Sequence, residues 1–179
     1  GEDGVAAYGV IMYVNFIFVA IYMGYSIGSA PIVGYHYGAK HQEELRGLLR
    51  RSLWILGIGA VLLTVVGELF SSPLSKIFVS YDDALFAMTR HGFRLYSLSY
   101  LLCGFNIFGS AFFTALNNGM VSAVISFSRT LVFQIVCVLV LPIFLELNGI
   151  WISILVAEFL GILVTASLLI ANRKKYSYF

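Results

Sequence analysis

Hydrophobic residues in this chain are gathered into long runs, and most charged residues lie in the short segments between those runs. A helix of about 20 apolar residues is long enough to cross a bilayer, because each residue adds about 1.5 Å. On this basis we predict five transmembrane helices, which are residues 5–34, 53–70, 95–116, 121–145 and 149–171. The expected fold class is all-α, a polytopic membrane helix bundle in which residues 1–179 form a single transmembrane domain.

The end of the first predicted helix is unusual. This helix is longer than a bilayer needs, so it should tilt or bend, and Pro31 is the natural place for a bend. The segment that follows, KHQEELRGLLRR (residues 40–51), has Leu45, Leu48, Leu49 and, just beyond it, Leu53 at helical spacing. We expect it to lie along the membrane surface with its basic face near anionic headgroups, and a solvated loop explains the same charges.

The composition supports a membrane protein. The chain is 60% hydrophobic and 11% charged, whereas soluble proteins average about 25% charged residues. Its net charge is only +2, and no basic face marks a nucleic-acid-binding surface. No P-loop or HExxH motif is present, and the three histidines are neither clustered nor at metal-ligand spacing. We therefore expect no cofactor, no metal and no enzymatic activity.

Lysine and arginine are distributed unevenly between the two sides predicted for the membrane. One side carries most of them: Lys40, Arg46, Arg50, Arg51, Arg173, Lys174 and Lys175. Because cytoplasmic loops are enriched in basic residues, this side should face the cytoplasm. We therefore predict a multi-pass protein of the inner (plasma) membrane whose C-terminus is cytoplasmic.

A few polar residues fall inside the predicted helices. Counted from the outer end of each helix, four of them reach a depth of roughly 14 to 16 Å, near the middle of the bilayer, and these are Asn15, Asn106, Gln134 and Glu158. Arg129 lies at roughly 24 Å by the same count. Such residues are costly in lipid and either join helices or line a transport pathway.

Glu158 is the sharpest of these candidates for a substrate or ion pathway. Its carboxylate can carry a proton, bind a cationic drug or pair with Arg129, and both a structural clamp and a role in transport remain open. We expect Asn15, Asn106 and Gln134 to act mainly as hydrogen-bonding groups between helices. Glu68, near the outer end of the second predicted helix, is expected to be an interfacial carboxylate in water.

Glycines recur within the apolar runs. Gly24 and Gly28 form a GxxxG step, and Gly104 and Gly109 lie in the third predicted helix. Small residues let membrane helices approach closely. We therefore expect these four glycines to lie at helix-packing surfaces.

Three stretches resemble one family of transporters. They are GVAAYGV near the start, GYSIGSAPIVGYHYGAKHQEELR at the end of the first predicted helix, and SFSRTLVFQIVCVLVLPIFLELNGIWISILVAEFLG over the last two. In their order and spacing they resemble the MATE (multidrug and toxin extrusion) family, with the closest likeness to its MepA-like bacterial branch. The resemblance implies that the chain corresponds to most of the C-terminal lobe, the last five of twelve helices.

The resemblance also implies a function. Family members are expected to export cationic or aromatic drugs by alternating access, in exchange for Na⁺ or H⁺, with a second, N-terminal lobe as the partner of this one. The acidic residues usually given coupling roles lie in helices outside this chain. A lipid-linked oligosaccharide flippase of the same superfamily is the alternative, although it calls for several cations in its cavity and only Arg129 lies within a predicted helix. An intramembrane enzyme or a structural membrane subunit is a third possibility.

Overall fold

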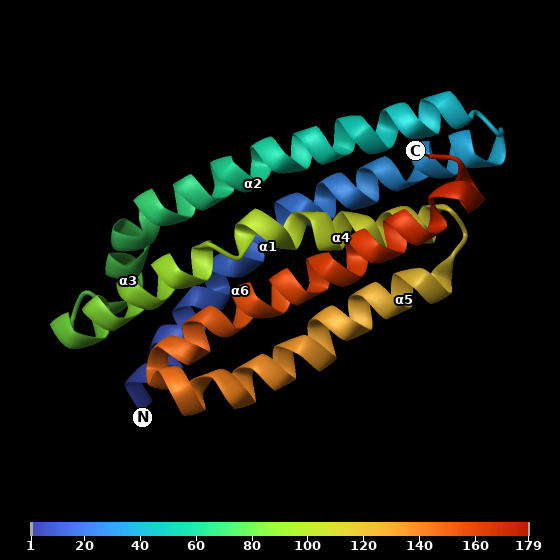
Figure 1. Ribbon diagram of the computed structural model, residues 1–179. Coiled ribbons are helices and arrows are strands. Elements are labelled where there is room, and N and C mark those ends of the chain that lie inside the picture. The colour runs from blue at the N-terminus through green and yellow to red at the C-terminus, as the bar shows by residue number, and fades with distance from the viewer. Residues whose placement is uncertain (1, 179) are drawn as a thin grey trace.

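The described part of the chain, residues 2–178, is an elongated bundle of helices in this computed structural model (Figure 1). Its elements are α1 (Glu2–Gly38), α2 (Gln42–Val79), α3 (Asp83–Ser97), α4 (Tyr100–Ala115), α5 (Gly119–Phe127), the π-helix η1 (Ser128–Phe133) and α6 (Gln134–Tyr176). No strand occurs within residues 2–178, so the all-α prediction is confirmed.

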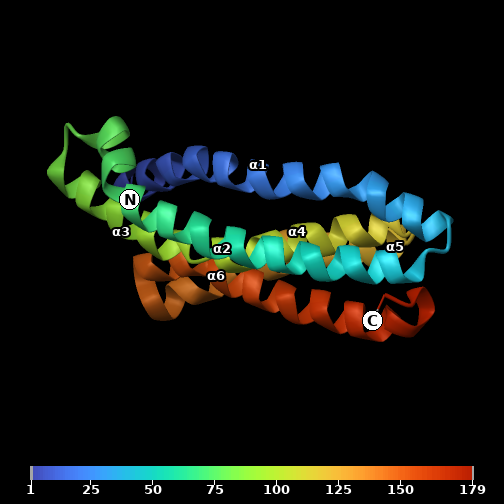
Figure 2. The ribbon, with the colours of Figure 1, turned by 90° about the horizontal axis from the view of Figure 1, so that it is seen from above.

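Short connections make neighbouring helices antiparallel. α1 and α2 are joined at residues 39–41, where Lys40 takes a left-handed conformation with φ 58°. α4 and α5 are joined through Asn117, with φ 57°, and Asn118, whose side chain accepts a hydrogen bond from the Val121 backbone N–H. Asparagine tolerates the left-handed region better than most residues do. The described ends of the chain consequently lie at opposite ends of the bundle (Figures 1 and 2).

α6 folds back on itself within its length. The stretch Gly119–Tyr176 contains 58 residues, which a straight helix would extend over roughly 87 Å, far more than a bilayer. Glu146 breaks it with φ 50° and ψ −131°. Gly149 then packs so closely on the first arm that an added Cβ would lie 2.6 Å from the Pro142 nitrogen. The result is a helical hairpin whose tip falls between the fourth and fifth predicted helices.

Helix length and apolarity fit a membrane. Three continuous helical stretches, Glu2–Gly38, Gln42–Val79 and Gly119–Tyr176, are long and apolar enough to cross a bilayer. α3 and α4 together form a fourth candidate, bent by 48° at their junction. With the hairpin counted as two arms, the bundle consists of five rods, and α4 packs against α1, α2, α5 and the second arm of α6.

One expectation about helix ends is corrected. The segment of residues 40–51 is neither a separate surface helix nor a loop, because α2 begins at Gln42 and continues without a break to Val79. Leu45 and Leu49, each 1% exposed, face the bundle interior and hold these first turns onto it. α1 also continues through Pro31 to Gly38.

The glycines divide into two groups. Gly104 contacts the Tyr22 ring and Gly109 contacts the Thr165 side chain so closely that a Cβ on either would clash, which confirms the packing expected of them. Around Gly24 and Gly28 no atom of the described chain lies within 4 Å of the Cβ position. The expectation that this GxxxG step packs on another helix is therefore wrong within residues 2–178.

Candidate functional site

A buried ion pair lies between the arms of the helical hairpin. The Arg129 Nε atom donates to both carboxylate oxygens of Glu158, at 2.8 Å to Oε1 and 2.9 Å to Oε2. The side chain of Glu158 is 7% exposed and that of Arg129 is 18% exposed. Of the alternatives left open for Glu158, pairing with Arg129 is thus the one that the geometry realises.

Asn106 extends this pair onto α4. Its Nδ2 donates to Glu158 Oε2 at 2.8 Å and to the Glu158 backbone carbonyl at 3.0 Å. Its Oδ1 accepts a hydrogen bond from the Thr165 hydroxyl at 2.8 Å. Asn106 is completely buried and Thr165 is 3% exposed. These four residues, Arg129, Glu158, Asn106 and Thr165, form what we call the midplane network, after the depth that the sequence predicts for Asn106 and Glu158.

The π-helix η1 places Arg129 in this network. A π-helical turn adds a residue to the normal helical repeat, and such turns often occur at functional sites. The sequence SFSRT supplies hydroxyls here: Ser128 donates to the Val124 carbonyl at 2.6 Å and Thr130 to the Ser126 carbonyl at 2.7 Å. Hydroxyls bonded back to the preceding turn favour helix distortion. The polar local sequence thus accounts for the irregular turn that carries Arg129.

The long side chain of Arg129 lets it meet Glu158 although the two residues lie at different distances from the tip of the hairpin. Measured from the break at Glu146, Arg129 is 17 residues away along one arm and Glu158 is 12 residues away along the other. The offset of five residues corresponds to about 7.5 Å of helix. An arginine side chain covers such a distance, since its long stem lets the guanidinium lie well away from its own backbone.

Gly161 makes room for the network. A Cβ at this position would lie 2.8 Å from Asn106 Nδ2 and 3.5 Å from the Arg129 Cγ atom. A side chain there would displace the amide of Asn106 from the carboxylate of Glu158. Glycine at this point is therefore part of the site although it carries no polar group.

The other two sequence candidates do not join the network. Asn15 on α1 and Gln134 at the start of α6 are both half-buried. Among residues 2–178 neither side chain has a hydrogen-bonding partner. Predicted depth along the helix was therefore insufficient to select the interacting set, because Asn15 and Gln134 share that predicted depth and are not hydrogen-bonded to the network.

A second polar cluster joins α4 to α5. Ser110 lies 2.8 Å from Ser122 and 2.7 Å from Ser126, measured between hydroxyl oxygens, and Thr114 lies 2.7 Å from Ser122. Ser110 with Thr114, and Ser122 with Ser126, are four residues apart and so share one helix face. We did not predict this cluster, although the four-residue spacing of its hydroxyls is visible in the sequence.

An ion pair at the other end of the bundle was also missed. Glu68 Oε2 accepts from Arg94 Nε at 2.8 Å, and its Oε1 accepts from the Ser97 hydroxyl at 2.8 Å. Glu68 is therefore not an isolated carboxylate in water, although its side chain remains 30% exposed. It ties α2 to α3, and nothing in the spacing of the two helices along the chain revealed this contact.

Side chains that bind metal ions are not gathered at one place in the described part of the chain. No group of three or more His, Cys, Asp or Glu side chains is placed to hold a metal ion there. The expectation that the histidines lie apart is wrong for one pair, because the rings of His36 and His41 have centroids 5.6 Å apart. They meet across the tight turn between α1 and α2.

Comparisons with known proteins agree with this architecture. The MatE family model matches residues 1–140. A "Probable multidrug resistance protein YoeA" from Bacillus subtilis (strain 168) is 26% identical over 85 residues, which is 48% of this chain and 18% of that protein.

Solved structures share the fold. The MATE transporter VcmN of Vibrio cholerae in its bent form matches with a TM-score of 0.85 and 21% identity, over 100% of this chain and 41% of that one. A MOP superfamily transporter from Pyrococcus furiosus, described as having a binding pocket of reverse polarity, matches with a TM-score of 0.86 and 20% identity, over 99% and 39% of the two chains. The chain thus spans about two fifths of the length of these structures.

The long apolar helices of the described chain define a multi-pass helical membrane protein. Because the family model covers most of its length, the chain belongs to the MatE family.

Proposed function

We propose that this chain is most of the C-terminal lobe of a twelve-helix exporter of cationic or aromatic drugs. Membership of the MatE family supports the transport function, and the match to about two fifths of the solved transporters agrees with five helices of twelve. The quoted sequence motifs favour the MepA-like branch of the family. An N-terminal lobe of the same protein would complete the transporter.

The single observation that carries the mechanism is the midplane network. It joins α4 to both arms of the hairpin through hydrogen bonds made by buried groups. Polar contacts of this kind hold membrane helices together. We propose that the network makes these helices move as one body when the lobe rocks against its partner during alternating access.

The network also bears on ion coupling. Both oxygens of Glu158 already accept hydrogen bonds from Arg129, and Oε2 accepts a further one from Asn106. The guanidinium of Arg129 already balances the charge of this carboxylate. We therefore propose a clamp as the role of Glu158, with the Na⁺ or H⁺ that drives export bound elsewhere in the complete protein.

We infer the orientation of the protein in the membrane from the basic residues gathered at one end of the bundle. The α1–α2 connection and the C-terminal end of α6 lie at the same end of the bundle (Figure 1). That end holds most of the lysines and arginines of the described chain. By the positive-inside tendency we place it in the cytoplasm and the protein in the inner (plasma) membrane.

Reconstitution tests the proposed function. The complete protein in liposomes should move ethidium or norfloxacin when an inward Na⁺ or H⁺ gradient is imposed separately, and should move neither without a gradient. The ion whose gradient drives transport is the coupling ion. Gradient-independent movement of a lipid-linked oligosaccharide, with no movement of either drug, would instead establish the flippase alternative.

A further inference from the structure

The guanidinium of Arg129 is only partly used by the midplane network. Its Nε atom alone makes both contacts with the Glu158 carboxylate, at 2.8 and 2.9 Å. Neither Nη atom has a hydrogen-bonding partner among residues 2–178, and both are accessible at the surface of the described chain. An arginine has five N–H donors, of which the two Nη atoms carry four. Most of the donors of this cation are therefore open.

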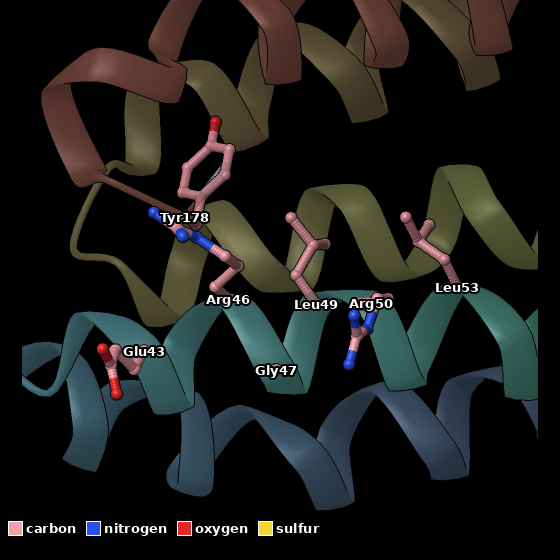
Figure 3. A pocket seen from close by; sticks show the side chains of 7 residues that line it. All are labelled: Glu43, Arg46, Gly47, Leu49, Arg50, Leu53 and Tyr178. Carbon is pink, nitrogen blue, oxygen red and sulfur yellow. The ribbon is translucent and has the colours of Figure 1, made fainter.

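Arg129 lies deeper in the bundle than the arginines at the start of α2. Arg46 and Arg50 line a hollow in the first turns of that helix, where Arg46 extends toward Tyr178 and Arg50 extends the other way (Figure 3). Arg129 instead lies ten residues beyond Gly119, the first residue of α5, which corresponds to about 15 Å of helix. A charged side chain this far inside a membrane helix faces protein or water rather than lipid. The open Nη atoms are thus expected to face water or another part of the complete protein.

Two hydroxyls lie one helical turn from the network, toward the α4–α5 connection. Ser126 precedes Arg129 by three residues and Ser110 follows Asn106 by four, so each shares a helix face with a member of the network. The oxygens of these two hydroxyls are 2.7 Å apart, and Ser126 is exposed. A hydroxyl both donates and accepts hydrogen bonds. Polar groups therefore continue from the open guanidinium toward the end of the bundle that holds the α4–α5 connection.

The accessible groups of this surface are hydrogen-bond donors. The side chain of Glu158 is 7% exposed, and both its oxygens already accept hydrogen bonds. α4, α5 and η1 contain no aspartate or glutamate. An acceptor with negative charge is therefore complementary to the surface. A carboxylate fits best, because a planar guanidinium donates two parallel hydrogen bonds to its two oxygens.

We propose that Arg129 binds the carboxylate of zwitterionic aromatic drugs, with the Ser126 hydroxyl as a neighbouring donor. This inference rests on the proposed function, and within its substrate class it singles out drugs that carry an acidic group. Norfloxacin is such a drug, because it has both a carboxylate and an amine, whereas ethidium has no acidic group. Glu158 is then a positioning residue, since its carboxylate holds the guanidinium by Nε and leaves the Nη atoms available.

Equilibrium binding to the complete, purified protein in detergent tests this inference. Fluorescence anisotropy compares norfloxacin with its methyl ester, which keeps the rings and the amine and lacks the carboxylate. Wild-type protein should bind norfloxacin about tenfold more tightly, as expected for a hydrogen-bonded contact between charged groups. Arg129→Lys should abolish this difference, because its one ammonium group is engaged by Glu158 and lacks the planar fork. Arg90→Lys, at an exposed position of α3, should retain the difference.

Cysteine labelling tests the same surface without a change at Arg129. Ser126→Cys in the complete protein should react with a charged methanethiosulfonate, because the reaction needs a thiolate and therefore water. Norfloxacin should protect this thiol and the methyl ester should not. Leu139→Cys, on the first arm of the hairpin at a position that is 67% exposed, should react slowly because it faces lipid. The protein without either substitution gives the background reaction.

Several results would overturn the proposal. They are equal affinities for norfloxacin and its ester, equal losses of both in Arg129→Lys, and a Ser126→Cys thiol that does not react. Inorganic diphosphate is added as a competitor, since the flippase alternative would place a diphosphate at the same arginine. Displacement of norfloxacin by less diphosphate than norfloxacin would also overturn it. If Arg129→Lys does not fold, the two ligands on wild-type protein still decide.

The outcome is separate from that of the proposed function. Binding and labelling need no ion gradient, whereas the proposed function is tested by gradient-driven transport of ethidium, which has no carboxylate. Ethidium transport without discrimination between norfloxacin and its ester would leave the exporter standing and remove the role of Arg129.

Discussion

The ring of Tyr22 on α1 lies directly against Gly104 on α4, and its hydroxyl donates to the Tyr100 carbonyl at 2.8 Å. Tyr22 is 2% exposed. Tyr22 therefore fills the space left by the missing side chain of Gly104, and it is one of several aromatic residues that join α1 to α4. Close approach over a small residue is a general means of packing membrane helices.

Gly104→Ala should destabilise the bundle. The added methyl group would overlap the Tyr22 ring, and overpacking of this kind typically costs about 1 to 3 kcal/mol. Gly28→Ala is the matched control, because nothing of the described chain lies within 4 Å of its Cβ position. Thermal unfolding of the complete protein in detergent measures both. A loss of stability in Gly28→Ala as large as that in Gly104→Ala would show that space around the glycine does not decide the effect.

Removing one partner of the Arg129–Glu158 ion pair should destabilise the protein more than removing both partners. Glu158→Gln leaves the Arg129 charge in a largely buried position, and a buried charge without its partner costs about 3 to 5 kcal/mol. Arg129→Met/Glu158→Leu removes both charges, and apolar replacements of buried pairs are often neutral. When unfolding by a denaturing detergent is measured, the stability of the double variant should be nearer to that of the wild type than the stability of Glu158→Gln is.

The same double variant separates a clamp from a coupling site. If Glu158 only joins helices, Arg129→Met/Glu158→Leu should keep ethidium efflux and its dependence on pH. A folded double variant that has lost gradient-driven efflux would show instead that the carboxylate takes part in transport.

Asn106→Leu should destabilise the protein more than Thr165→Val. Asn106→Leu removes a donor to Glu158 and the acceptor of the Thr165 hydroxyl, and it leaves two buried groups short of partners at about 1 to 3 kcal/mol. Thr165→Val removes one donor, and single polar contacts between membrane helices average about 0.6 kcal/mol. Stability measured for both and for the double variant gives their coupling. Strictly additive effects would argue against a connected network.

Glu68→Gln should have a small effect in comparison. Glu68 and Arg94 are partly exposed, with side chains 30% and 57% accessible, and exposed ion pairs contribute about 0.2 to 1 kcal/mol. The contribution should fall further at high salt, which screens exposed charges. Unfolding midpoints at low and high ionic strength check this, with Glu158→Gln as the buried counterpart whose effect should persist.

Much of the architecture was readable from the pattern of apolar runs. Long runs predicted helices, and the charged breaks between them predicted where the chain reverses, as at residues 39–41 and at Glu146. The π-helix η1 and the bend between α3 and α4 were not predicted, because both lie inside uninterrupted helical patterns. The surface helix expected at residues 40–51 was wrong, because its leucines also fit a buried face of α2.

The sequence alone determined that the chain is a helical membrane protein, and it predicted which polar residues lie near mid-bilayer, since a depth is predicted by counting residues at a fixed rise per residue. Only the tertiary structure decided that Glu158 meets Arg129 and Asn106 while Asn15 and Gln134 remain outside the network. The reason is that a partner also depends on how each helix is rotated about its axis. That rotation is set by packing, by the room at Gly161 and by the irregular turn at Arg129, which are properties of several helices together.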